Sequence, residues 1–274
     1  MISNTDHFHQ FEHEGWQRVA EKYESAWNGL VRPFIPYLLD AAGVRSGIRI
    51  LDAACGPGTV AKAAHNIGAI ATGVDFSSKM IHIARKNNSQ IEFHVGDVQA
   101  LLFDDNIFDS VVMNFGLLHL SRPKAAFAEA FRVIRPGGWY SFTVWASPDK
   151  SPGARIVSEA ITNYADQTNL IPEGPNYFGF GTPEECSNIL GNIGFDPASI
   201  VFRSVTIEWK VPSVSYLFEC ECDAGVRNAA VLAAQKPEIL EAIRNQIEDS
   251  VSAYAKDDGF VIPFTAHVIA IRAL

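Results

Sequence analysis

The chain has 274 residues, of which 47% are hydrophobic and 19% are charged, and its formal net charge is −9. This is an ordinary globular balance, and the length suits one large domain or a domain with a cap. The acidic charge argues against a nucleic-acid partner, because such binding usually needs a basic patch that displaces counterions. No apolar run approaches the roughly 18 residues of a membrane helix, so we expect no membrane partner.

The N-terminus bears on the cellular location of the protein, and the cysteines bear on metal binding. The first ten residues are polar and lack the pattern of a secretory signal, which predicts a cytoplasmic protein. Cys220-Glu-Cys222 is too tight for a usual zinc pair, and no second pair accompanies it. We therefore expect free thiols and no metal site. The sequence is compatible with a monomer or a homodimer.

Residues 11–43 carry apolar and aromatic side chains at three- and four-residue spacing, which predicts helix. Pro33 and Pro36 interrupt the pattern and Gly43 ends it. The helix either packs beside the rest of the fold or covers a ligand, and its aromatic content favours the second interpretation. We predict an N-terminal helical lid over residues 1–45.

The segment that follows has the pattern of a strand, a glycine-rich turn and a helix. It reads Ile48-Arg-Ile-Leu-Asp-Ala-Ala-Cys-Gly-Pro-Gly-Thr-Val-Ala61. Gly56 and Gly58 lack a Cβ, so a ligand can approach the backbone closely. The new helix presents unpaired N–H groups and the positive end of its dipole. Asp52 places a carboxylate at the strand tip, where it could hold a cationic ammonium group.

Strands and helices then alternate through the central part of the chain. The predicted strands are 70–75, 91–95, 108–114 and 140–145, and the predicted helices are 59–66, 77–86 and 123–134. This alternation predicts a parallel sheet with helices on both faces. Because right-handed crossovers place the strand tips on one edge, Asp52, Asp75, Asp97 and Asn114 should lie there, where open α/β sheets bind ligands.

The pattern changes after Trp145. We predict helices at 155–166 and 182–190, strands at 200–211 and 260–271, and a mostly helical stretch at 213–258 with breaks near Gly225 and Pro237. Within the domain 46–274, segments 147–198 and 213–258 are candidate substrate caps. The second segment could instead cover the sheet edge or form a dimer face.

Several motifs in this order resemble the class I S-adenosylmethionine-dependent methyltransferases. Leu51-Asp-Ala-Ala-Cys-Gly-Pro-Gly58 resembles the glycine-rich first motif, and Gly73-Val-Asp-Phe-Ser77 resembles the ribose-binding strand end. Gly96-Asp-Val-Gln99 resembles the adenine-contacting turn, and Phe108-Asp109 and Arg135-Pro-Gly-Gly138 complete the set. The resemblance covers residues 45–146. It implies a Rossmann-like doubly wound α/β sheet of about seven strands whose last strand is antiparallel, with a helical insertion between strands six and seven.

The resemblance also implies S-adenosyl-L-methionine as cofactor and a small-molecule acceptor as substrate. Asp75 would accept the ribose hydroxyls. Asp97, Val98 and Phe76 would surround the adenine, and Asp52 and Gly56 would meet the methionine end. Alternatively, each aspartate simply caps a helix or forms a turn. The full set of candidate cofactor contacts is Tyr23, Asp52, Ala53, Gly56, Gly58, Asp75, Phe76, Met80, Asp97, Val98 and Asn114.

Methyl transfer chiefly needs alignment of the nucleophile with the methyl group. A base helps only where the nucleophile starts protonated, and His119, five residues past Asn114, is the candidate. The alternative is that His119 packs or hydrogen-bonds inside the site. Candidate substrate contacts are Trp145, Tyr177, Phe178 and Tyr216, together with Phe180 and Phe218, although for each residue taken alone the core interpretation is favoured. O-methylation is the first expectation, with N- or C-methylation behind it.

Two other functions stay open. Gly56-x-Gly58-x-x-Ala61 also fits the fingerprint of an NAD(P)-dependent oxidoreductase. Against that function, we see no Tyr-x-x-x-Lys catalytic pair of the kind that short-chain dehydrogenases need. The third hypothesis is a non-catalytic cofactor-binding protein of the same fold, since fold alone does not establish activity.

Overall fold

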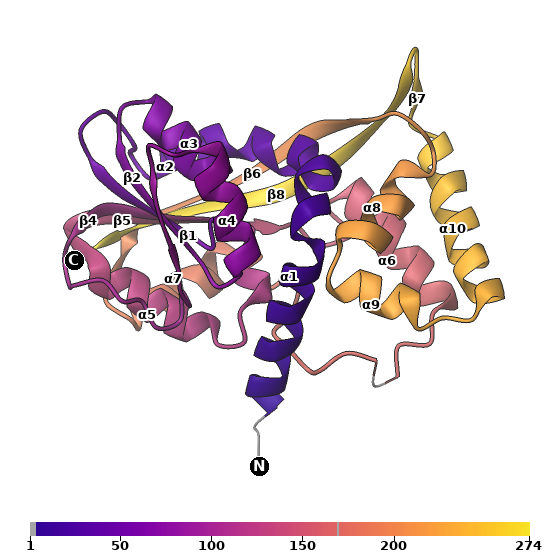
Figure 1. Ribbon diagram of the computed structural model, residues 1–274, viewed down its shortest axis with the longest axis horizontal. Helices are drawn as coiled ribbons and strands as arrows, with labels where there is room; N and C mark the ends of the chain where they lie inside the picture. The colour runs from indigo at the N-terminus through magenta and orange to yellow at the C-terminus, as the bar shows by residue number, and fades with distance from the viewer. Residues whose placement is uncertain (1–3, 169) are drawn as a thin grey trace. The chain divides into compact units, whose positions relative to one another are not determined.

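A computed structural model describes residues 4–168 and 170–274. The chain divides into two compact units, whose helices and strands are labelled in Figure 1. The first unit comprises the residues up to Leu30 with 146–173 and 206–266. The second comprises 31–145, 174–205 and 267–274.

Five parallel strands form the centre of the second unit. They are β1 (Arg49–Ala53), β2 (Ile70–Asp75), β3 (Glu92–Val95), β4 (Phe108–Asn114) and β5 (Ile134–Trp145). In the register, Asp52 lies opposite Gly73 on one side and Val112 on the other, and Asp75 lies opposite Val95. The carboxyl ends of these strands therefore meet at one edge, as the alternating sequence pattern predicts.

Three further strands complete an eight-stranded sheet. They are β6 (Phe195–Val211), β7 (Ala255–Lys256) and β8 (Gly259–Ala273). The strand order is β3-β2-β1-β4-β5-β8-β6, with β7 paired antiparallel to β8. The predicted Rossmann-like α/β fold with antiparallel last strands is confirmed.

The number of strands and the start of β6 differ from the sequence prediction. Strand β7 lies inside 213–258, which we predicted as mostly helical, and it makes eight strands where we expected about seven. It forms because Gly259, at φ 154°, turns the chain back so that the Val261 amide donates to the Tyr254 carbonyl over 3.0 Å. Strand β6 begins five residues earlier than predicted. Pro197 does not prevent this, because β6 is an edge strand and proline is tolerated there.

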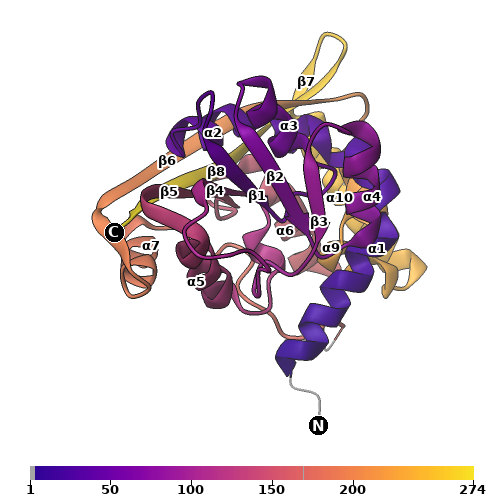
Figure 2. The same cartoon turned by 60° about the vertical axis from the view of Figure 1, so that its left-hand side comes forward.

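Helices cover both faces of the sheet in the second unit. They are η1 (Arg32–Phe34), α2 (Ile35–Ala41), α3 (Thr59–Asn66), α4 (Ser78–Asn87), η2 (Leu117–His119), α5 (Pro123–Val133) and α7 (Pro183–Gly191). Successive strand residues point to opposite faces, so Ile50 packs with α2, α3 and α4, whereas Leu51 packs with α5 and α7. Figure 2 shows α5 and α7 on the face opposite α3 and α4. The two apolar clusters hold the strand tips in place.

The first unit is mainly helical. It contains most of α1 (Asn4–Val31) with α6 (Pro152–Tyr164), α8 (Tyr216–Ala224), α9 (Arg227–Ala233) and α10 (Pro237–Ser252). Buried Glu12 of α1 accepts from Arg227 Nε of α9 over 2.8 Å, and the Trp27 ring stacks on Trp209 with centroids 5.9 Å apart. These contacts fix α1 within its own unit. No helix in the described part of the chain is long and apolar enough to span a membrane.

The boundaries of the two units do not coincide with the predicted domain boundaries. Segment 147–198 is shared between the units, because the division falls after residue 173. The lid 1–45 is likewise divided after Leu30, where α1 gives way to the proline-containing turn η1. The roles of these segments as lid and substrate caps stay predictions.

Candidate functional site

The glycine-rich turn after β1 has the backbone geometry that its sequence demands. Ala54, Gly56 and Gly58 have φ angles of 55°, 52° and 84°, in the left-handed region that favours glycine. A Cβ on Gly58 would lie 2.7 Å from Phe93 Cζ, so that position needs glycine for packing. A Cβ on Gly56 would meet nothing within 4 Å, so space remains open beside this residue. Gly56 therefore leaves room for another group to approach the backbone.

The side chains of Asp52 and Asp75 accept hydrogen bonds from backbone amides of this turn and of the helix that follows it. The Ala61 amide, in the first turn of α3, donates to Asp52 Oδ2 over 2.8 Å. The Gly56 amide donates to Asp75 Oδ2 over 2.9 Å, and the Ser77 amide donates to Asp75 Oδ1 over 2.8 Å. The capping role that we weighed for both aspartates is thus present. It places two acidic side chains beside the glycine turn, and each oxygen that accepts an amide has a second lone pair for a ligand.

Asp52 is the most perturbed acid of the site. Its side chain is 1% exposed, and its Oδ1 has no hydrogen-bond partner among the described residues. Burial raises the pKa of Asp52 from 3.8 to about 8, opposed by the Ala61 hydrogen bond and reinforced by the charge of Asp75. Burial likewise raises the pKa of the neighbouring Cys55 thiol. A buried carboxyl with one unsatisfied oxygen is suited to a cationic hydrogen-bond donor.

A second strained turn follows β4 and touches the first. Phe115 has a φ of 56°, and its amide donates to Thr143 Oγ1 over 2.8 Å. Thr143 Oγ1 in turn donates to Asn114 Oδ1 over 2.8 Å. A Cβ on Gly116 would lie 2.7 Å from Ala54 Cβ, so the turns after β1 and β4 are in direct contact. Left-handed non-glycine residues cluster at functional sites, and here two of them occur at adjoining strand tips.

His119 lies at the end of η2, three residues after Gly116. It is half-buried, and its amide donates to the Gly116 carbonyl over 3.1 Å. The residue therefore follows the turn that contacts Ala54. Its role as base stays a prediction.

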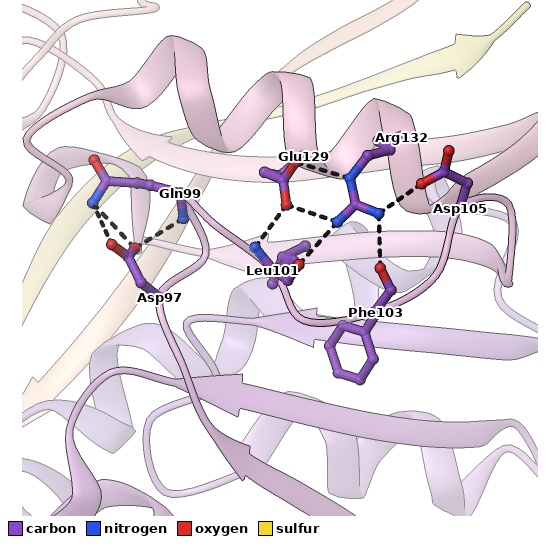
Figure 3. Close-up of polar contacts among 7 residues, drawn as sticks. All are labelled: Asp97, Gln99, Leu101, Phe103, Asp105, Glu129 and Arg132. Carbon is purple, nitrogen blue, oxygen red and sulfur yellow. Dashed lines mark hydrogen bonds and ion pairs between the residues drawn. The ribbon is translucent and has the colours of Figure 1, made fainter.

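The turn after β3 is fixed by a polar network on α5, drawn in Figure 3. Asp97 Oδ1 accepts from the Gln99 amide over 2.8 Å. Farther along, Arg132 donates to the Leu101 carbonyl over 2.9 Å and to the Phe103 carbonyl over 2.7 Å. Arg132 also pairs with Glu129, which lowers the pKa of that carboxyl. The segment that follows Asp97 is thus anchored to α5 at Leu101 and Phe103.

Sequence reasoning missed this network. Glu129 and Arg132 are three residues apart on a predicted helix, and that spacing is the signal that could have revealed their pairing. Their bonds to the carbonyls of Leu101 and Phe103 carry no such signal, because those groups belong to every residue. Gln99 lies in the Gly96-Asp-Val-Gln99 motif, but the motif alone predicts no role for its side chain.

The remaining cofactor candidates are mostly buried. Ala53, Met80 and Val98 are 2%, 2% and 4% exposed, so their side chains belong to the core around the turns, whereas Phe76 is partly exposed. Ser77 caps α4, its Oγ accepting from the Met80 amide over 3.3 Å. Tyr23 belongs to the first unit and packs edge-on against Trp16, with centroids 5.4 Å apart.

The candidate substrate residues occur in both units. Trp145 stacks on Phe115 with centroids 4.0 Å apart, which puts an aromatic surface at the tips of β4 and β5. Tyr177 and Phe178 pack against each other on the loop before α7. Tyr216 lies in the first unit, where its hydroxyl donates to the Ser25 carbonyl over 2.8 Å.

Phe180 and Phe218 pack against other side chains, and their role as substrate contacts stays a prediction. The Phe180 ring packs edge-on against Phe127 of the core, with centroids 5.2 Å apart. Phe218 is 7% exposed and lies under the Arg244 guanidinium. No cluster of three or more metal-binding side chains occurs in residues 4–168 and 170–274.

Comparison with known proteins connects this geometry to a family. Residues 51–142 match the family model described as a methyltransferase domain. The match contains the turn after β1 and the acids Asp52, Asp75 and Asp97. This segment is therefore similar to a methyltransferase domain.

The chain also aligns with named relatives over about half of its length. Demethylmenaquinone methyltransferase of Renibacterium salmoninarum is 34% identical over 147 residues, which cover 52% of this chain and 62% of that protein. Malonyl-(acyl-carrier protein) O-methyltransferase of Salmonella typhimurium is 29% identical over 156 residues, which cover 57% of this chain and 61% of that protein. Both alignments span less than two thirds of the relative.

A solved structure extends the likeness to nearly the whole chain. Phosphoethanolamine N-methyltransferase 2 of Haemonchus contortus, in complex with S-adenosyl-L-methionine, superimposes with a TM-score of 0.59 at 18% identity. The superposition covers 96% of this chain and 60% of that one. At this identity it shows the fold.

Proposed function

We propose that the chain is an S-adenosyl-L-methionine-dependent methyltransferase that acts on a small-molecule acceptor. The observation that carries the proposal is the pair of carboxylates, Asp52 and Asp75, that occupy the amides of the glycine turn. Asp75 carries a negative charge and Asp52 ionises beside a cation, so this edge favours a ligand that is cationic where it meets the turn. The matched methyltransferase domain supports the same conclusion.

The residues at the carboxyl ends of the strands suit the methionine, ribose and adenine groups of this cofactor. The open space at Gly56 and the unsatisfied Oδ1 of Asp52 suit the ammonium group of the methionine end. Asp75 suits the ribose hydroxyls, and Asp97 with Val98 suits the adenine. When bound, the cofactor would supply a methyl group on a good leaving group, and the chain would align an acceptor with it.

The same pair of carboxylates disfavours a dinucleotide. A dinucleotide site binds the pyrophosphate through the amides of the glycine turn and the helix N-terminus. Here Gly56 and Ala61 already donate those amides to carboxylates. A pyrophosphate would find these amides occupied and would face the charge of Asp75, so the oxidoreductase hypothesis is the weaker one.

The side chains at the strand tips indicate the class of acceptor. Phe115 and Trp145 present stacked rings at the tips of β4 and β5, which favours an apolar or aromatic small molecule. The relatives named as demethylmenaquinone and malonyl-(acyl-carrier protein) methyltransferases are consistent with a small or carrier-bound acceptor. O-methylation is our first expectation, and His119 would take the proton from a hydroxyl acceptor. With a net charge of −9, nucleic acid is a poor candidate for the substrate.

The test is an acceptor screen with cofactor that carries an isotope-labelled methyl group. The full chain is incubated with phenols, carboxylates, amines and a demethylmenaquinone, and mass spectrometry follows both the product and S-adenosylhomocysteine. We expect one acceptor class to gain a labelled methyl group in step with S-adenosylhomocysteine. Tight cofactor binding without transfer to any acceptor would support the non-catalytic alternative.

A further inference from the structure

Gln99 links the predicted adenine turn to the segment between η2 and α5. Its side chain is buried, and Nε2 donates to Asp97 Oδ1 over 3.1 Å and to Oδ2 over 3.2 Å. On its other side, Oε1 accepts from the Arg122 amide over 2.6 Å and from Ser121 Oγ over 3.1 Å. Figure 3 shows the bonds from Gln99 to the Asp97 carboxylate. One side chain thus joins Asp97 to two residues that follow His119 closely in the chain.

The partners leave this amide a single orientation. The Arg122 amide can only donate, so the oxygen of Gln99 must face it. The nitrogen of Gln99 then faces the Asp97 carboxylate and donates to both of its oxygens. These two contacts, with the bond from the Gln99 backbone amide to Oδ1, restrain the orientation of the carboxylate.

The backbone of the same turn is held independently. The Leu101 amide donates to Glu129 Oε2 over 2.6 Å, and Arg132 binds the carbonyls of Leu101 and Phe103. Because these bonds anchor the chain two residues beyond Gln99, the loss of the Gln99 side chain should free the Asp97 carboxylate without unfolding the turn.

We propose that Gln99 is a positioning residue for nucleobase recognition. It holds the Asp97 carboxylate in the orientation that accepts the 6-amino group of adenine, so that the enzyme distinguishes adenine from purines without that group. The inference rests on the proposed function, because it takes Asp97 to face the adenine of the cofactor.

The test compares two ligands on two proteins by calorimetry. The ligands are S-adenosylhomocysteine and its 6-deamino analogue, in which hydrogen replaces the amino group. For wild type we expect the analogue to bind about 10-fold more weakly, because Asp97 loses a charge-assisted hydrogen bond. Gln99→Met should raise the Kd of S-adenosylhomocysteine about 10-fold. It should leave the Kd of the analogue within about twofold of wild type, because that ligand has no amino group to position.

Gln235→Met is the matched control. Gln235 Oε1 also accepts from a backbone amide, that of Asp166, but this glutamine belongs to the first unit. Both Kd values should equal those of wild type in this variant. If Gln99→Met does not fold, Gln99→Asn replaces it, because that amide is one methylene too short to bridge Asp97 and Arg122, and the same pattern is expected.

Each other outcome overturns the inference in a recognisable way. Equal weakening of both ligands in the Gln99 variant would make Gln99 a general support of the fold. Unchanged Kd values for both ligands would remove it from recognition altogether. Equal binding of the two ligands by wild type would mean that Asp97 does not accept a hydrogen bond from the amino group. If wild type binds neither ligand, the proposed function itself fails.

Discussion

Binding of S-adenosylhomocysteine should release a proton from Asp52. Burial raises the pKa of this carboxyl to about 8, so at pH 7 it is mostly protonated in the free protein. An ammonium group at its unsatisfied Oδ1 favours the ionised form and lowers the pKa. The cofactor product therefore binds the ionised carboxylate, and the proton leaves as it binds.

The magnitude follows from the pKa. With a pKa of about 8 in the free protein, about 0.9 proton is released per bound ligand at pH 7. Affinity should rise with pH, because a higher pH removes the proton that binding must otherwise expel. Between pH 6 and pH 8 the fraction of ionised Asp52 grows about 50-fold, and Kd should fall by the same factor.

The assay is isothermal titration calorimetry at pH 6, 7 and 8, with the pH 7 titration repeated in buffers of different ionisation enthalpy. The slope of the observed binding enthalpy against the ionisation enthalpy of the buffer gives the number of protons released. Asp52→Asn is the control: it cannot titrate, so its proton release and its pH dependence should vanish. A wild-type Kd that stays constant from pH 6 to pH 8, with no proton release, would refute the assignment of Asp52 to the ammonium group.

Three further predictions concern the lid, the base and the anchored turn. In hydrogen exchange, residues 11–31 should become protected when S-adenosylhomocysteine binds; protection at 52–60 alone would make α1 a plain structural helix. In steady-state kinetics with a phenolic acceptor, His119→Ala should lower turnover by roughly 10²–10⁴-fold at nearly constant cofactor affinity, and near-normal turnover would remove His119 as base. Arg132→Ala should lower the free energy of unfolding by roughly 2–3 kcal/mol in urea titrations, because it loses charged hydrogen bonds to Glu129 and to two loop carbonyls. Arg132→Lys should recover less than half of that loss, since lysine lacks the planar fork, and full recovery would contradict the role of that geometry.

The strand tips were predictable because they depend on local pattern and on a general rule of topology. Strands 70–75 and 108–114 have the predicted bounds, and Asp52, Asp75 and Asn114 lie at the common edge. Apolar runs bounded by turn residues define such strands, and right-handed crossovers align their ends. The position of the site is therefore readable from the chain alone.

The state of the site was not predictable in the same way. The buried Oδ1 of Asp52 and its raised pKa depend on packing from several elements, which no local pattern records. The bond from Gly56 to Asp75 and the contact between Ala54 and Gly116 join residues far apart in sequence. The short strand β7 was missed because two residues are too few to give a periodic signal.

Calorimetric titration of the full chain with S-adenosylhomocysteine and, separately, with NADH tests the central claim most directly. We predict a micromolar Kd for S-adenosylhomocysteine, equivalent to roughly 8 kcal/mol, and no heat with NADH. Asp75→Ala should weaken the first interaction by roughly 1–3 kcal/mol, because the ribose loses a charged acceptor. Heat with NADH and none with the sulfur nucleoside would contradict the methyltransferase proposal.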